Sequence, residues 1–280
     1  MSPPMPETPP LHLTKHHGAG NDFLVSIDMD DQAPLGAELV RALCDRRFGI
    51  GADGVVRVLA GGGEADLTMV LCNADGSVAE MSGNGMRCLA QAAVEAGLVE
   101  PPTFRVMTMV GVRSVEYRPA GGTGAAVASV DMGVPTLGPD QPERAVEGRA
   151  RQVNVGNPHL VLLGPDPSAV DVADEGVRLQ AAHVGGINVE FIAIGPGTDA
   201  ITLRVWERGV GETQACGTGS IAAAAAAHSW GLVSDTVDVH NPGGTLQVAL
   251  AADGARLIGP VHKVADIDVI AAEVLGAARP

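Results

Sequence analysis

Alternating apolar and polar residues mark a series of short strands along the chain. Such alternation places every second side chain on one face, which is typical of a half-buried β-strand. The clearest segments in the first half are residues 11–15, 24–27, 55–59, 66–72, 104–109 and 112–117. Residues 201–206 alternate in the same way in the second half. We therefore expect strands to dominate the fold.

Three segments have the spacing or composition of a helix instead, namely residues 35–46, 86–96 and 220–227. The second stops at Gly97 and the third is followed by Gly231, and glycine is a common helix terminator. The third contains six consecutive alanines, so it has no polar face to offer to water. We expect strands to surround and bury that helix on all sides.

Landmarks of the first half recur in the second half at a nearly constant offset. The matched pairs are Gly20-Asn21 with Gly156-Asn157, Gly51 with Gly185 or Gly186, Asn73 with Glu207, and Ser82 with Cys216. Their offsets are 136, 134 or 135, 134 and 134 residues. A repeat of this length is far longer than a solenoid unit, so it predicts two related lobes.

These patterns predict an α+β fold of two pseudo-symmetric lobes. Each lobe is expected to be a mostly antiparallel sheet wrapped around a central helix, with the active site in the cleft between them. The boundaries expected are residues 11–134 for the N-terminal lobe and 135–265 for the C-terminal lobe, with 266–280 as a candidate for packing back on the first. Residues 1–10 hold five prolines and no basic residue, which predicts a disordered tail and not a signal peptide.

Composition and charge exclude several classes of function. The formal net charge of −15 argues against nucleic acid or an anionic membrane as a partner. No apolar run approaches the ~20 residues of a membrane-spanning helix. The four cysteines form no C-x-x-C pair, which predicts reduced thiols in a cytoplasmic protein and no structural zinc. Lys15 and Lys263 are the only lysines, so a pyridoxal cofactor has little support.

Two glycine turns that lead into helices carry the candidate chemistry. Within residues 79–88, Ser82 precedes Gly83-Asn84-Gly85, and Cys216 precedes Gly217-Thr218-Gly219. The free N–H groups and positive dipole of a helix start favour an anion such as a carboxylate. The first turn therefore leads with a hydroxyl and the second with a thiol. We expect the helix start to lower the thiol pKa from its free value of about 8.5.

Two such helix starts, facing each other across a cleft, suit a reaction on both faces of one atom. Inversion of a stereocentre is such a reaction, because one group removes a proton and another returns a proton from the opposite side. The helix starts would hold the adjacent carboxylate and stabilise the carbanion-like transition state.

A set of motifs covering about residues 11–266 resembles one known family. The motifs are Gly20-Asn21-Asp22-Phe23, Gly49-Ile50-Gly51-Ala52-Asp53-Gly54, Asn73-Ala74-Asp75-Gly76-Ser77, Gly83-Asn84-Gly85-Met86-Arg87-Cys88, Gly156-Asn157-Pro158-His159, Asn188-Val189-Glu190-Phe191, and Glu207 to Thr213 followed by Cys216-Gly217-Thr218-Gly219. In this order they resemble the diaminopimelate epimerases of the proline racemase superfamily. The resemblance implies a cofactor-independent, cytoplasmic, homodimeric isomerase that interconverts LL- and meso-diaminopimelate in lysine and peptidoglycan precursor synthesis.

The same resemblance implies a role for individual residues. Cys216 matches one of the two catalytic cysteines of the family, and the other falls on Ser82. The residues expected to grip the distal end of the substrate are Asn21, Asn73, Asn157, Asn188 and Arg208. The donors expected at the carboxylate of the reacting carbon are Gly83, Asn84, Gly217 and Thr218. His159 and Glu207 are expected to orient the reacting amino group, and no metal ligand is implied.

Serine at position 82 departs from the family pattern. A hydroxyl is far less acidic than a thiol, and Cys44, Cys72 and Cys88 occupy positions that do not match the missing cysteine. Three hypotheses follow: an epimerase in which Ser82 performs a weakened version of the second proton transfer, a one-base lyase or isomerase of a related amino acid, or a catalytically impaired ligand-binding form, natural or engineered. Ser82 as a plain helix N-cap is the structural alternative.

Overall fold

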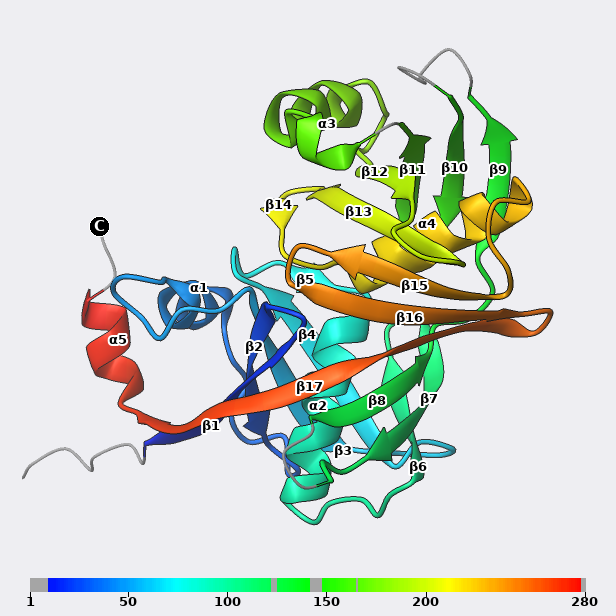
Figure 1. Ribbon diagram of the computed structural model, residues 1–280. Coiled ribbons are helices and arrows are strands. Elements are labelled where there is room, and N and C mark those ends of the chain that lie inside the picture. The colour runs from blue at the N-terminus through cyan, green and yellow to red at the C-terminus, as the bar shows by residue number, and fades with distance from the viewer. Residues whose placement is uncertain (1–9, 122–124, 142–147, 165, 278–280) are drawn as a thin grey trace, which may run out of the picture.

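The computed structural model describes residues 10–121, 125–141, 148–164 and 166–277. Two lobes lie one above the other, each with strands wrapped around one long helix, α2 (Gly83–Glu95) or α4 (Gly217–Ser229) (Figure 1). The tail that we expect to be disordered lies outside the described residues, apart from the exposed Pro10. The predicted α+β fold of two pseudo-symmetric lobes is confirmed.

The N-terminal lobe is a closed ring of eight strands around α2. In ring order the strands are β1 (Leu11–Gly18), β2 (Asn21–Ile27), β3 (Gly54–Ala60), β4 (Leu67–Asn73), β6 (Thr103–Thr108), β7 (Gly111–Arg118), β8 (Ala126–Asp131) and β17 (Gly254–Val269), which pairs back with β1. Only the β2–β3 and β4–β6 pairs are parallel. Helix α1 (Ala37–Cys44) connects β2 to β3, and α2 lies between the short strand β5 (Val78–Ala79) and β6.

The C-terminal lobe repeats this order of elements around α4. Its strands, in spatial order, are β9 (Thr136–Asp140), β10 (Ala150–Asn154), β11 (Pro158–Leu163), β12 (Asn188–Ile194), β13 (Ala200–Glu207), β15 (Thr236–Asn241), β16 (Gly244–Ala251) and the first part of β17. Helix α3 (Val172–Ala181) takes the place of α1, and β14 (Gly211–Thr213) takes the place of β5. The 3-10 turn η2 (Pro167–Ala169) has no counterpart among the described residues of the first lobe.

Strand β17 joins the two lobes into one sheet. Its first residues pair with β16 on one side and β8 on the other, and its second half pairs with β1. A 16-residue strand is long enough to cross from one lobe to the other, as Figure 1 shows. Helix α5 (Ala271–Ala277) follows it and lies against α1. The chain after the predicted C-terminal lobe thus runs along the first lobe.

Burial explains the composition of the two central helices. The six alanines from Ala222 to Ala227 are at most 5% exposed, which confirms the prediction of a helix enclosed on all sides. A methyl side chain lets strands approach the helix closely on every face without leaving a polar group unsolvated. Helix α2 is enclosed in the same way, but it carries Arg87 at 0% exposure. This charged residue has no polar counterpart on α4.

Candidate active site

The two central helices begin with the same local geometry. Ser82 precedes α2 in an extended conformation, and its Oγ accepts a hydrogen bond from the Gly85 N–H at 3.0 Å. Cys216 precedes α4 in an extended conformation, and its Sγ accepts from the Gly219 N–H at 3.4 Å. Both side chains are therefore N-caps. Each caps the N–H of the third helical residue, which leaves the N–H groups of the first two helical residues to bind an anion.

Glycine at the first position of each helix allows the two starts to touch. A Cβ on Gly217 would lie 3.3 Å from the Cα of Gly83. Leu257 of β17 lies against both positions, because its Cδ2 would be 2.4 Å from a Cβ on Gly83 and 2.7 Å from one on Gly217. A side chain at Gly217 would press on the backbone of Gly83, and one at Gly83 would displace Leu257. The positive ends of two helix dipoles therefore meet at one place.

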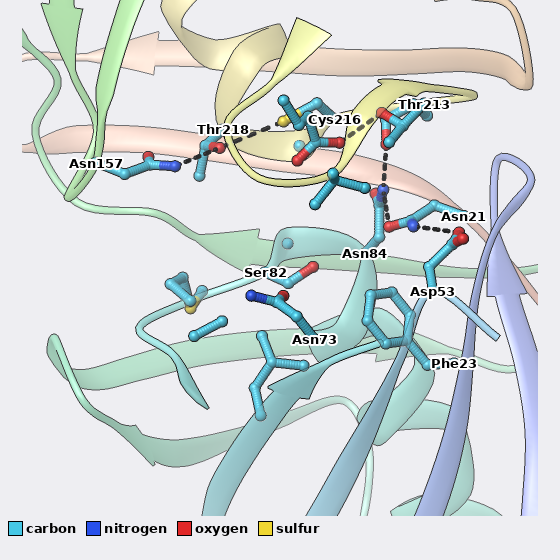
Figure 2. A pocket seen from close by; sticks show the side chains of 18 residues that line it. Asn21, Phe23, Asp53, Asn73, Ser82, Asn84, Asn157, Thr213, Cys216 and Thr218 are labelled. Carbon is cyan, nitrogen blue, oxygen red and sulfur yellow. Dashed lines mark hydrogen bonds between the residues drawn. The ribbon is translucent and has the colours of Figure 1, made fainter. Parts of the chain in front are cut away.

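A pocket opens in front of this meeting point. Its lining comes from both lobes and comprises Asn21, Phe23, Asp53, Leu71, Asn73, Ala79, Met81, Ser82, Gly83, Asn84, Asn157, Glu207, Val210, Thr213, Ala215, Cys216, Gly217 and Thr218. Cys216 and Ser82 approach it from opposite sides, one from each lobe (Figure 2). This is the arrangement that a reaction on both faces of a single atom requires.

Ten of the thirteen residues predicted for the site line the pocket. The three that do not are His159, Asn188 and Arg208. Arg208 is exposed and its Nη1 donates to the Gly185 carbonyl at 3.0 Å, while its backbone N–H donates to Asn188 Oδ1 at 2.8 Å. These two residues are thus held together by a hydrogen bond outside the pocket. His159 is fully buried behind Asn157.

The surroundings of Cys216 differ from those expected of a thiol at a helix start. Burial raises the pKa of this thiol well above its ordinary value, and the nearby Glu207 and Glu190 carboxylates raise it further. Hydrogen bonds from Thr218 and from the Gly219 N–H oppose this effect but do not reverse it. The expectation of a lowered pKa is therefore wrong, because loss of solvation exceeds the effect of the helix start. The resting group is a thiol, ready to donate a proton.

Glu207 supplies a carboxyl group beside that thiol. The Thr213 hydroxyl donates a hydrogen bond to Glu207 Oε1. Burial raises the Glu207 pKa, whereas hydrogen bonds with Thr213 and Cys216 lower it by a smaller amount. A carboxyl with a raised pKa is a stronger base when ionised, so it is better able to accept a proton from the neighbouring thiol.

The side chain amides in the pocket already have partners within the protein. Asn21 Nδ2 donates to Asp53 Oδ2 at 2.6 Å, and Asn84 Nδ2 donates both to Asn21 Oδ1 at 2.8 Å and to the Ala215 carbonyl at 3.0 Å. Asn84 thereby links the first lobe to the turn that carries Cys216. Its side chain is committed to this link, so only its backbone N–H remains to bind a substrate.

Three groups near the pocket were not identified from the sequence. Asp53 anchors Asn21 and also accepts from Arg46 at 2.7 Å. Arg87, fully buried in α2, donates to Asn84 Oδ1 at 2.7 Å, and burial lowers the pKa of its guanidinium to about 10, so it stays charged at neutral pH. Glu190 is fully buried behind Cys216. All three residues lie inside the family motifs. The signal that could have identified them is that each is a charged residue within a motif but was given no role.

Two further classes of site can be addressed within the described residues. No group of three or more His, Cys, Asp or Glu side chains there is arranged to hold a metal ion. None of the helices in this part of the chain has the length and apolar character needed to cross a membrane.

Solved structures with this fold include several enzymes of the same architecture. A hydroxyproline epimerase from Agrobacterium vitis superposes with a TM-score of 0.72 over 95% of this chain and 94% of its own, at 18% identity. A phenazine biosynthesis protein of the PhzF family from Bacillus anthracis gives a TM-score of 0.73 over 94% of this chain and 99% of its own, at 14% identity. At these identities the likeness concerns the fold.

Sequence comparison gives a closer relation. The family model described as diaminopimelate epimerase matches residues 13–138 and 151–264. The diaminopimelate epimerase of Corynebacterium glutamicum is 42% identical over 266 residues, which cover 89% of this chain and 95% of that one. That of Thermobifida fusca is 41% identical over 277 residues, covering 92% and 98%. On this match, together with two helix starts that meet at one pocket, the chain belongs to the diaminopimelate epimerase family.

Proposed function

We propose that this protein interconverts LL- and meso-diaminopimelate, with proton transfer at the α-carbon between Cys216 on one face and the position of Ser82 on the other. The observation that carries this proposal is the meeting of the two helix starts, with a thiol and a hydroxyl on opposite sides of one pocket (Figure 2). The match to relatives named diaminopimelate epimerase supplies the substrate.

The backbone at the two helix starts binds the carboxylate next to the reacting carbon. The N–H groups at Gly83, Asn84, Gly217 and Thr218 point into the space where the helices meet, and they bear the positive ends of two dipoles. Removal of the α-proton spreads negative charge from the carbon into that carboxylate. These fixed donors therefore stabilise the transition state more than the ground state.

Cys216 and Glu207 carry the proton on one face. In the direction that needs an acid, the thiol donates its proton to the carbanion-like carbon and leaves a thiolate. In the reverse direction, the thiol must first lose its proton, and the adjacent Glu207 carboxylate can accept it. The substrate ammonium group would favour both anions, because an opposite charge within a few ångströms favours the ionised form.

Ser82 is the weaker side of the site. Its Oγ already accepts from the Gly85 N–H, and the groups that line the pocket around it include Phe23, Leu71 and Met81. No carboxyl or imidazole group is hydrogen-bonded to Ser82 in the described residues. Ser82 therefore takes part by holding a water, which accepts the α-proton when Cys216 is the acid and returns a proton when Cys216 is the base, and the rate of inversion is limited on this face.

The distal end of the substrate is held by the amides of Asn21, Asn73 and Asn157, which line the pocket. Arg208 forks the distal carboxylate once its side chain leaves the Gly185 carbonyl, and Asn188 follows through its hydrogen bond to the Arg208 backbone. Closure of the lobes around the substrate brings these groups together. The active form is a homodimer in the cytoplasm, in keeping with the family.

One structural feature favours a second hypothesis, that of a one-base lyase or isomerase. The carboxyl groups of Glu207 and Glu190 lie close to Cys216, so a reaction that needs a single base there would lose nothing through Ser82. A binding protein without turnover is the remaining alternative.

Proton exchange in D2O separates these hypotheses. The purified protein is incubated with LL-diaminopimelate in D2O, the α-proton signal is followed by NMR, and the isomers are separated by chiral chromatography. Exchange accompanied by the meso isomer is the expected result. Exchange or elimination without inversion would support the one-base hypothesis, and tight binding without exchange would reduce the protein to a ligand-binding form.

A further inference from the structure

The two helix starts differ in the residue that packs behind the second glycine of each turn. A Cβ on Gly85 would lie 3.4 Å from Cγ2 of Val56, whereas a Cβ on Gly219 would lie 2.9 Å from Oε1 of Glu190. The two glycines are 134 residues apart, and so are Val56 and Glu190, so these are the same position in the two lobes. One lobe places an aliphatic side chain there and the other a carboxyl.

A chain of hydrogen bonds leads from that carboxyl to the pocket. Glu190 Oε1 lies 2.7 Å from His159 Nδ1, and both side chains are completely buried. His159 Nε2 lies 2.8 Å from Asn157 Oδ1. Asn157 Nδ2 then donates to Thr218 Oγ1 at 3.5 Å, and that oxygen lies 3.5 Å from the Cys216 sulfur.

The contacts of His159 with Glu190 and with Asn157 set the direction of these hydrogen bonds. Asn157 Oδ1 can only accept, so His159 Nε2 must carry a proton. Nδ1 is satisfied by the Glu190 carboxyl, whether the shared proton lies on the nitrogen or on the oxygen. With its oxygen engaged by His159, Asn157 turns its NH2 group toward Thr218 and the pocket, as Figure 2 shows.

We propose that Glu190 is a positioning residue: through His159 it fixes the carboxamide of Asn157 so that its NH2 group faces the pocket as a donor to a substrate carboxylate. The inference rests on the proposed function, in which Asn157 binds the substrate. It assigns a role to a carboxyl that does not itself line the pocket.

A purely structural role does not explain a carboxyl at this position. Glu190 is 0% exposed, and among the residues that the structure describes its Oε2 has no hydrogen-bond partner. Such a group lowers stability relative to an apolar side chain of similar size. The other lobe shows that this fold accepts Val56 at the equivalent position, and that lobe has Phe23 where the second lobe has His159. Retention of the polar pair is thus explained by the orientation it imposes on Asn157.

Kinetics of Glu190 variants test this role. Glu190→Val, which copies the first lobe, should raise KM for diaminopimelate about 10- to 100-fold, because a hydrogen bond to a charged group is lost when the Asn157 amide is free to turn. Glu190→Gln, which keeps a hydrogen-bonding side chain of the same shape, should raise KM much less than Glu190→Val does. Leu160→Val, next to His159 but facing the opposite side of β11, is the matched control and should leave KM unchanged.

A double-mutant cycle shows whether Glu190 acts through His159. In a His159→Phe background, Glu190→Val should change KM no further, because the intermediate link is already absent. Independent, additive effects of the two substitutions would overturn the proposal, and so would an unchanged KM in Glu190→Val.

The protonation of His159 gives a test that needs neither turnover nor a substituted Glu190. In protein labelled with 15N-histidine, the His159 signals are identified by their loss in His159→Phe. The proposal requires Nε2 to be protonated in the free enzyme at neutral pH. A His159 protonated only on Nδ1 would overturn it, even if the protein proves to be an active epimerase. A correct tautomer in a protein without epimerase activity would instead place the failure in the proposed function.

Discussion

Helices α2 and α4 begin alike but are supported differently. Each starts with a glycine and follows an extended N-cap residue, and the first two residues of each helix line the same pocket. Behind Cys216 lie the titratable side chains of Glu190, Glu207 and His159. The position equivalent to Glu190 behind Ser82 is the aliphatic Val56.

The two helix starts show that anion binding and proton transfer depend on different parts of the structure. Anion binding depends on backbone geometry, and the repeat preserves it in both lobes. Proton transfer depends on individual side chains, and these differ: the Glu190 carboxyl behind Cys216 is replaced by Val56 behind Ser82. The first lobe carries instead a buried cation, Arg87, where α4 has Ile221 at the equivalent position. The duplicated scaffold therefore holds an asymmetric site: a proton-carrying side and a positively charged side.

The largest effect is expected from removing the thiol. Cys216→Ala should lower the rate of α-proton exchange by about 10³-fold or more, since general acid–base catalysis contributes roughly 10²- to 10⁴-fold. The matched control is Cys88→Ala, in which the lost thiol is buried within α2 and has a pKa that burial raises to about 12. The measurement is deuterium incorporation by NMR, and substantial exchange in Cys216→Ala would contradict the assigned roles of the two sides.

The difference between the two helix starts can be removed by giving both of them a thiol. Ser82→Cys should raise the rate of inversion by about 10²-fold or more, because a thiol is a far better proton carrier than a hydroxyl. Formation of the meso isomer from LL-diaminopimelate is the assay. Ser234→Cys, which adds a thiol at an exposed position of the other lobe, is the control. If Ser82→Cys inverts no faster than the parent, residue 82 does not face the reacting carbon.

A smaller effect is expected from the buried cation. Arg87→Met removes the donor to Asn84 Oδ1 and should lower kcat/KM about tenfold, the effect of losing one hydrogen bond to a charged group. Stability should change by no more than about 2 kcal/mol, since relief of the buried charge offsets the lost bonds. Ile221→Met at the equivalent position of α4 should leave kcat/KM as it is. Equal losses of activity in the two variants would argue that Arg87 is merely a packing residue.

The smallest effect concerns the pH dependence of stability. Burial raises the pKa of Glu190 above its ordinary value, while His159 on β11 lowers it by less, and Glu207 and Cys216 are the other titratable groups nearby. The folded chain then holds this proton to higher pH than the unfolded chain, so the contribution of Glu190 to the free energy of unfolding falls as pH rises above about 4.3.

Glu190→Gln has no such proton to lose. Its stability relative to the parent should therefore improve between about pH 4 and about pH 8, by roughly 1.4 kcal/mol for each unit by which the fold raises the pKa. Urea unfolding at the two pH values measures this difference. A relative gain for the parent at the higher pH would mean that the Glu190 pKa is lowered in the fold.

Local sequence signals predicted the elements with regular spacing and missed those that depend on distant partners. The three predicted helices correspond to α1, α2 and α4 with small shifts at their ends, and the alternating segments correspond to strands of the structure. Helix α3 was not predicted. Residues 266–280 were a candidate for packing back on the first lobe, but the long pairing of β17 with β1 was not predicted, because it joins residues about 250 positions apart and leaves no local pattern. The predicted lobe boundaries remain a prediction.

The sequence by itself determined the repeat, the two glycine turns and the difference between Ser82 and Cys216, because backbone conformation and side chain chemistry are local properties. The tertiary structure decided how those turns are used. Gly83 and Gly217, which are 134 residues apart in the sequence, lie against each other and against Leu257 of β17. Burial in the fold then raises the Cys216 pKa that its position at a helix start would lower, and it brings Glu190 and His159 behind one turn only. Loss of solvation and long-range contact arise only once the chain has folded, so the electrostatic asymmetry of the site could not be obtained from residue spacing.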